Sequence, residues 1–168
     1  EMARMDYDFL YDEVRHLLAI GYNVTERRRG YAQAERRRDA SYYDLLASEA
    51  RLSSFLAVAQ GQLPQETWFA LGRLLTLAGG EPVLVSWSGS MFEYVMPQLV
   101  MPSYQNTLIE QTNRAAVRRQ IEYGNQRGVP WGMSESGYNM VDASRNYQYR
   151  AFGVPGLGLQ RGLADDLV

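Results

Sequence analysis

The chain has 168 residues, of which 46% are hydrophobic and 21% are charged, and its formal net charge is -2. This length supports one domain with a hydrophobic core, and the charge gives no global field that would attract nucleic acid or an anionic membrane. The absence of cysteine excludes disulfides and thiolate metal sites, and the single histidine, His16, argues against a zinc site or a Ser-His-Asp triad. We therefore expect acid–base chemistry to rest on carboxylates, tyrosine or groups tuned by arginine, with no metal and no cofactor.

Residues Asp8 to Val24 predict a β-hairpin, because apolar residues alternate loosely on both sides of a turn candidate at Asp12-Glu13. A helix through Val14–Ile20 is the rival interpretation. The Thr25–Ala40 stretch that follows repeats the motif Glu-Arg-Arg-Arg. We interpret it as a solvated surface loop or a short helical insertion rather than a basic binding patch.

Two helices are predicted next. The first runs from Ser41 to Ala59, carries a broad apolar face and has Ser41 as its N-cap. The second opens at Pro64, a residue favoured in the first turn, and Gly79-Gly80 ends it. The short apolar run Val83-Leu84-Val85 does not decide between a strand and an extended loop.

Two further helices and two loops complete the chain. The pattern is helical over Met91 to Val100, where Pro97 must kink or end the helix, and again over Thr107 to Gln126. The Gly-rich segment Gly128 to Asn139 predicts a loop, and an aromatic-rich stretch follows at Asp142 to Phe152. Helix pairs joined by such loops predict a mainly all-α fold, part of an α/α toroid or a bundle, in which the loops carry the site.

The first candidate site is Ser86-Trp87-Ser88-Gly89-Ser90-Met91-Phe92-Glu93-Tyr94. Glu93 lies in the first turn of a predicted helix, where the helix dipole favours an ionised carboxylate. An ionised carboxylate suits a nucleophile, a base or a hydroxyl-binding acid better than a proton donor. The alternative is an acid that only stabilises the helix.

The second candidate is Glu135, with Trp131, Tyr138 and Asp142 near it in the sequence. Aromatic neighbours desolvate a carboxyl group, and desolvation favours the protonated form that a general acid needs. Tryptophan and tyrosine also offer flat faces on which a sugar ring can stack. The alternative is a structural turn whose glutamate accepts backbone N–H bonds.

The third candidate is Asn146-Tyr147-Gln148-Tyr149-Arg150, whose amide, phenol and guanidinium groups are good partners for hydroxyls. Aromatic packing with an arginine that extends to solvent is the alternative for each member. The sequence therefore offers two candidate catalytic carboxylates, Glu135 and Glu93, and a set of candidate substrate-binding residues: Trp87, Tyr94, Trp131, Tyr138, Asp142, Tyr147, Tyr149 and Arg150.

Segments spread over nearly the whole chain together resemble the glycoamylase-like domain in the middle of bacterial cyclic β-1,2-glucan synthases. The combination is specific, although no single motif would suffice. The segments are Gly21-Tyr22-Asn23-Val24, Tyr43-Asp44-Leu45-Leu46-Ala47-Ser48-Glu49-Ala50-Arg51-Leu52, Ser86 to Tyr94, Val129-Pro130-Trp131-Gly132-Met133-Ser134-Glu135-Ser136, and Asn146 to Gly158.

The resemblance implies an (α/α)6 toroid, of which residues 1–168 would be a single-domain fragment from the N-terminal part, with the native domain continuing past Val168. It implies a retaining transglycosylation that cyclises linear β-1,2-glucan, with Glu135 as the acid/base. Glu93 is then the second carboxylate, or a substrate-binding residue if the nucleophile lies in a downstream Phe-Tyr-Glu segment of the family. Such chemistry needs two carboxyl groups.

Two alternatives remain open at this point: an endo-β-1,2-glucanase built on the same residues, and a glucan-binding fragment without catalysis. The resemblance also implies covalently linked partners, a glycosyltransferase domain that uses UDP-glucose and a phosphorylase-like domain. The full synthase would be a protein of the bacterial inner membrane, with this domain soluble, on the cytoplasmic side and without membrane contact.

Overall fold

A computed structural model describes residues 5–24, 38–151 and 153–159, and within these the side chains of residues 136–140, 148, 150 and 151 are not described. Most of the arginine-rich Thr25–Ala40 stretch and the chain end at Leu163–Val168 lie outside the described residues. The chain divides into two compact units. Unit 1 comprises Glu1–Leu46 and Ala50–Gly72, and unit 2 comprises Ala47–Glu49 and Arg73–Val168.

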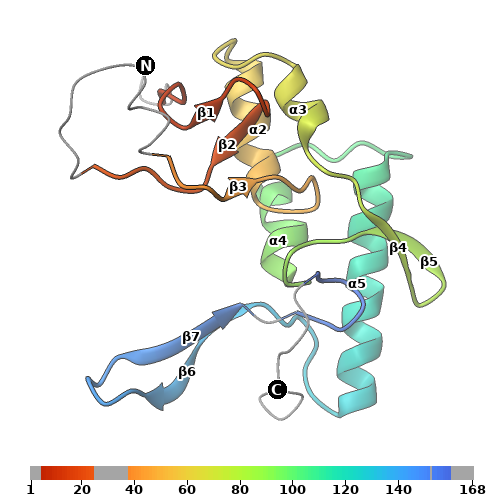
Figure 1. Ribbon diagram of the computed structural model, residues 1–168. Coiled ribbons are helices and arrows are strands. Elements are labelled where there is room, and N and C mark those ends of the chain that lie inside the picture. The colour runs from red at the N-terminus through yellow and green to blue at the C-terminus, as the bar shows by residue number, and fades with distance from the viewer. Residues whose placement is uncertain (1–4, 25–37, 152, 160–168) are drawn as a thin grey trace. The chain divides into compact units, whose positions relative to one another are not determined.

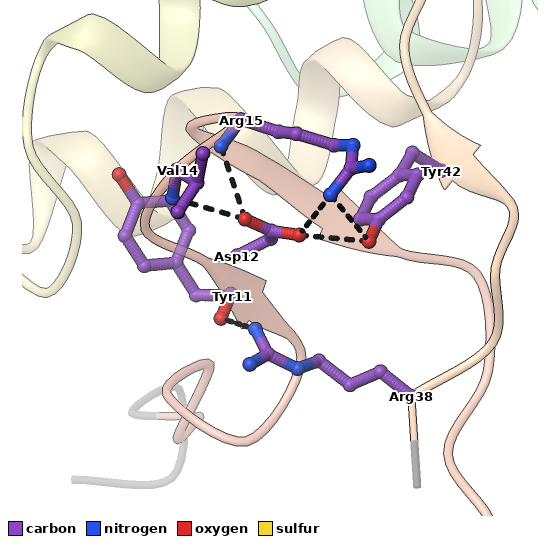
Figure 2. Close-up of polar contacts among 6 residues, drawn as sticks. All are labelled: Tyr11, Asp12, Val14, Arg15, Arg38 and Tyr42. Carbon is purple, nitrogen blue, oxygen red and sulfur yellow. Dashed lines mark hydrogen bonds and ion pairs between the residues drawn. The ribbon is translucent and has the colours of Figure 1, made fainter. Parts of the chain in front are cut away.

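Unit 1 begins with a small antiparallel sheet of order β1-β2-β3, made of β1 (Tyr11–Asp12), β2 (Leu17–Ala19) and β3 (Tyr42–Tyr43). The β1–β2 hairpin confirms the first prediction, and the rival helix is wrong. Figure 2 shows why the turn forms where it does: the Asp12 carboxylate accepts the backbone N–H groups of Val14 and Arg15, each at 3.0 Å. A short acidic side chain that bonds the backbone beyond it favours a turn over a helix.

The helices of unit 1 are α2 (Ala50–Ala59) and α3 (Glu66–Ala70). The predicted helical start at Ser41 is wrong, because the neighbouring β3 pairs with β2 and the Ser41 carbonyl accepts the Ile20 N–H at 3.0 Å. Sheet pairing thus overrides a capping pattern that a local reading favours. Residues from the hairpin side and from α2 share one apolar core, made of Tyr7, Leu18, Ala57 and Leu63.

Unit 2 opens with a second hairpin, β4 (Leu75–Ala78) and β5 (Glu81–Leu84), where the sequence predicted the end of a helix. Gly79 and Gly80 have φ values of 60° and 82°. Two consecutive residues with positive φ form the two-residue turn whose twist matches a β-hairpin, and Gly-Gly is among its favoured sequences. The glycines therefore form the turn between the two strands. Val83 and Leu84 belong to β5, so most of the run Val83-Leu84-Val85 is a strand rather than an extended loop.

Three helical elements follow: α4 (Met91–Val95), the 3-10 helix η2 (Met96–Leu99) and α5 (Leu108–Arg127). The α-helix ends before Pro97, as predicted, and α5 confirms the long helix. The Thr107 hydroxyl caps α5 by accepting the Glu110 N–H at 3.3 Å, and Gly128, with φ 68°, ends it.

The last described elements are β6 (Glu135–Val141) and β7 (Tyr147–Ala151), which pair antiparallel as one ribbon (Figure 1). The predicted loop therefore ends at Ser134, and Glu135 begins a strand. The prediction of a mainly all-α, partly toroidal fold is wrong: the described residues combine helices with three antiparallel sheets. Among the same residues, no helix is both long and apolar enough to cross a membrane.

Candidate active site

The carboxylate of Glu93 orders the turn that precedes its own helix. The side chain is 4% exposed. Donors converge on it from the turn: the Trp87 N–H at 3.0 Å, the Ser88 N–H at 3.1 Å, the Ser90 N–H at 3.0 Å, and the hydroxyls of Ser86, Ser88 and Ser90. Glu93 also completes a capping box with Ser90. These donors saturate the acceptor sites of a carboxylate, so the geometry favours the alternative in which Glu93 holds the Ser86–Ser90 turn.

Tyr94, the residue after it, is fully buried. Its hydroxyl lies 2.8 Å from the carbonyl oxygens of Leu84 and Leu157 and accepts the Ser86 N–H at 3.2 Å. A ring with no exposed face cannot stack on a sugar. Tyr94 therefore anchors the turn to β5 and to the segment around Leu157, and we do not assign it to substrate.

The Gly153–Gly158 segment packs backbone to backbone against this turn. The Ser86 N–H donates to the Leu157 carbonyl at 2.9 Å, and the Leu159 N–H donates to the Ser86 carbonyl at 2.9 Å. A Cβ atom on Gly153 would lie 1.7 Å from the Ser88 carbonyl oxygen. The glycines thus allow two segments of the backbone to approach closely. The exposed Trp87 lies on the turn that they support.

Glu135 forms the centre of the second cluster. It begins β6 opposite Ala151, and Tyr149 lies two residues before Ala151 on β7. Diagonal neighbours in a hairpin lie on the same face, and here the Tyr149 hydroxyl donates a hydrogen bond to Glu135 Oε2. That bond, with desolvation and the charge of Glu135 and Glu49, raises the pKa of Tyr149 to about 12. Tyr149 thus stays a protonated donor to Glu135 at every physiological pH.

Glu49, which belongs to unit 2, joins this cluster. Its charge contributes to the raised pKa of Tyr149, so it lies within electrostatic range of the phenol. One of its carboxylate oxygens, Oε2, is shielded from solvent. Two carboxylates, Glu49 and Glu135, therefore act on one phenol.

The remaining candidates divide into two groups. Trp131 and Tyr147 are exposed, at 52% and 71%, and Trp131 lies four residues before Glu135. Asp142 lies at the far end of the β6–β7 ribbon, where it accepts the N–H groups of Ser144 and Asn146, each at 2.9 Å. Bonds from Asn146 and Ser144 outweigh desolvation and lower the pKa of Asp142. Asp142 therefore shapes the hairpin turn, at the opposite end of β6 from Glu135.

The side chains of two candidates, Tyr138 and Arg150, lie outside the described residues. Glu49 was not among the predicted site residues, although its place in the Tyr43–Leu52 segment shared with the resembling family was a usable signal. Gln120, buried on α5, gave no signal, because a glutamine in a long polar helix is expected to face solvent. The structure therefore brings Glu135 and Tyr149 into contact, leaves Glu49 within electrostatic range of Tyr149, and places Asp142 at the other end of the ribbon.

Comparisons with known proteins identify the family of the chain. The family described as "Putative glucoamylase" matches residues 41–166. A cyclic beta-(1,2)-glucan synthase, NdvB, of Rhizobium meliloti (strain 1021) is 49% identical over 164 residues, which cover 98% of this chain and 6% of that protein. The chain thus spans a small part of the length of this relative. The family match includes all the residues of both clusters. The chain belongs to the glycoamylase family.

Proposed function

We propose that this chain carries part of a carbohydrate-active site that acts on linear β-1,2-glucan by retaining transglycosylation and so cyclises it. The observation that carries the proposal is the Glu135–Tyr149 hydrogen bond at the start of β6, within electrostatic range of a second carboxylate, Glu49. The glucan is suggested by the printed name of the relative, a cyclic beta-(1,2)-glucan synthase. Retaining chemistry needs two carboxyl groups, a nucleophile and an acid/base.

The hydrogen bond from Tyr149 bears on the role of Glu135. The Tyr149 hydroxyl donates to Glu135 Oε2 and so fixes the orientation of an oxygen that accepts a hydrogen bond. A nucleophile presents such an oriented oxygen to the anomeric carbon, whereas the resemblance assigned Glu135 the acid/base role. We therefore assign the nucleophile to Glu135 and the acid/base to Glu49, the second carboxylate within electrostatic range of Tyr149.

Glu93 enters this proposal as a residue that shapes the site without reacting. Its carboxylate holds the Ser86–Ser90 turn, and the turn presents the 41%-exposed indole of Trp87. Trp131, 52% exposed, stands on the segment that leads into Glu135. Exposed indoles are suitable platforms for the apolar faces of sugar rings, so we assign Trp87 and Trp131 to glucan binding.

Azide separates the two catalytic roles. When an acid/base variant is given azide, the anion attacks the glycosyl-enzyme and yields a glycosyl azide with retained configuration. When a nucleophile variant is given azide, the anion attacks the substrate directly and yields the inverted product. We expect retention for Glu49→Ala and inversion for Glu135→Ala. The reverse pair of products would exchange the two roles.

Hydrolysis by the same residues is the second candidate, favoured by the family description as a glucoamylase. The two differ in whether a sugar hydroxyl or water intercepts the glycosyl-enzyme. Incubation with linear β-1,2-glucan and mass analysis of the products distinguishes them. Rings, which are lighter by one water than linear chains of the same length, support transglycosylation. Shorter linear chains support hydrolysis, and binding without any product supports a non-catalytic module.

The proposal extends to the surroundings of this chain. Because the chain matches 6% of the length of the synthase, we propose that it works covalently linked to glycosyltransferase and phosphorylase-like domains, in a protein of the bacterial inner membrane. Those domains would supply the linear glucan and limit its length. Detection of the chain within one long polypeptide, with antibodies against residues of unit 2, tests this arrangement.

A further inference from the structure

Gln120 is a buried glutamine whose amide is fully engaged by two loops of unit 2. It is 0% exposed on the inner side of α5. Its Nε2 donates to the Met133 carbonyl at 3.1 Å and to the Gly89 carbonyl at 3.3 Å, and its Oε1 accepts the Met133 N–H at 2.8 Å. One side chain therefore ties the Ser86–Ser90 turn to the Trp131–Ser134 loop.

Both loops carry residues of the proposed site. Trp87 projects from the first, and the second leads directly into Glu135. Further bonds run between the second loop and α4: the Met91 N–H donates to the Met133 carbonyl at 2.9 Å, and the Phe92 N–H donates to the Ser134 hydroxyl at 3.1 Å. Gln120 is the member of this network that contacts both loops from a rigid helix.

Gly124 belongs to the same face of α5, against which the loop before Glu135 packs. It lies four residues after Gln120, and residues at that spacing share a helix face. A Cβ atom on Gly124 would lie 3.0 Å from both the Trp131 Cβ and the Val129 carbonyl oxygen. The missing side chain thus admits the start of the loop against the helix, one turn beyond the point where Gln120 holds Met133.

A side chain that only filled this space would not need an amide. Burial of an amide is unfavourable unless its groups are bonded, and an apolar side chain of similar volume avoids that cost. All the bonds of Gln120 named above go to the backbone of two loops rather than to other side chains. An amide used in this way fixes the relative position of the loops, which packing alone does not.

We propose that Gln120 is a positioning residue: its hydrogen bonds hold the two loops that carry Glu135 and Trp87 in the relative position that the reaction needs. We call these hydrogen bonds the latch. This inference rests on the proposed function. The Gln120→Leu variant removes the latch and keeps the bulk. We expect faster hydrogen exchange at the Met133 amide, and a kcat lower by on the order of tenfold to a hundredfold with little change in KM.

The Gln120→Glu variant tests the donor role separately. The introduced carboxyl group has one O–H, so it can donate to either the Met133 or the Gly89 carbonyl, and only while it is protonated. Its kcat should therefore approach that of the wild type at acid pH and fall as the pH rises through the titration of the introduced group. Gln126→Glu, the same change at an exposed position of α5, is the matched control and should follow the wild-type pH profile.

Three outcomes overturn the latch: unchanged Met133 exchange in a folded Gln120→Leu variant, unchanged kcat in that variant, or a pH profile of Gln120→Glu that matches Gln126→Glu. If Gln120→Leu does not fold, the Gln120→Glu profile decides. If the wild-type protein turns over no glucan, the proposed function fails. The exchange at Met133 then decides separately whether Gln120 holds the loop.

Discussion

Tyr149 donates a hydrogen bond to Glu135 and carries a shifted pKa. Its folded pKa is raised, to about 12, above the usual value for tyrosine. A group with a raised folded pKa contributes stability below its unfolded pKa, near 10, and that contribution is lost as the pH rises from about 10 to 12. The hydroxyl is thus a donor to Glu135 throughout the neutral range, and its loss should be visible both spectroscopically and in turnover.

Replacement of Tyr149 by phenylalanine tests this bond. Ultraviolet titration of the wild type should show absorbance that rises near pH 12, and Tyr149→Phe should reduce this component by the equivalent of one tyrosine. Turnover should fall on the order of tenfold or more, because Glu135 loses the donor that fixes the orientation of its carboxylate. Tyr147→Phe, on the same strand and exposed, is the control for the titration. An unchanged component near pH 12 in Tyr149→Phe would contradict the assignment.

Asp12 gives unit 1 a defined response to acid. Burial acts to raise its pKa, but hydrogen bonds from the Arg15 and Val14 backbone and from the Tyr42 and Arg15 side chains outweigh burial and lower it to about 2 (Figure 2). A lowered folded pKa contributes stability above the unfolded pKa, near 4, and that contribution is lost as the pH falls from about 4 to 2.

Urea unfolding, measured from about pH 2 to about pH 6, gives the contribution of Asp12 to the free energy of unfolding. We expect Asp12→Asn to lower the free energy of unfolding by about 1 to 2 kcal/mol at pH 6 and by much less at pH 2. Asp8→Asn, at an exposed position, should change neither value appreciably. An equal loss at both pH values would show that the charge of Asp12 is not the stabilising feature.

At the scale of elements, glycines lie where two backbone segments pack closely against each other. We expect Gly153→Ala to lower the free energy of unfolding by about 2 to 3 kcal/mol, because its Cβ would overlap the Ser88 carbonyl. Gly21→Ala is the control, since its Cβ would make an ordinary contact, 3.6 Å from Asp39 Oδ2. Urea unfolding compares the two variants. A Gly153→Ala protein as stable as Gly21→Ala would mean that the two backbones are not packed as described.

The elements that could be predicted are those with local signals. Thr107 caps α5, Pro97 ends α4, and Asp12 turns the first hairpin, so each boundary lies within a few residues of its cause. The helix expected from Ser41 is wrong because β3 pairs with a strand more than twenty positions away, as the register Ala19↔Tyr42 shows. Such non-local pairing has no signature at Ser41 itself.

For the site, too, the sequence identified individual residues but not the contacts that depend on distant segments. Glu135, Trp131 and Tyr149 stand out as an acid among aromatic residues, and the sequence placed them in candidate sites. The contact between Glu135 and Tyr149 depends on the β6–β7 register, which the expectation of a loop at Glu135 concealed. The surroundings of Glu93 depend on the Ser86–Ser90 turn folding back on the helix, so the sequence could name the acid but not its donors.

For the whole molecule, the family was recognisable although the expected fold class was wrong. The resemblance was carried by residues spread over nearly the whole chain, and recognising them did not require knowing whether the intervening segments are helices or strands. The all-α expectation failed because leucine-rich stretches such as Leu74–Ala78 fit a helix and a strand alike when they are short. The two compact units then provide separate surroundings, with Glu135, Tyr149 and Glu49 all in unit 2.

The central claim is that Glu135 is a catalytic carboxylate for β-1,2-glucan, and the most direct measurement compares Glu135→Gln with the wild type. Binding of linear β-1,2-glucan is measured by calorimetry, and turnover by release of cyclic or shorter products. We predict that Glu135→Gln binds the glucan with unchanged affinity and loses on the order of a thousandfold or more in kcat. Glu122→Gln, an exposed acid on α5, should keep both. A Glu135→Gln protein that forms products at the wild-type rate would contradict the account, as would a wild-type protein that forms none.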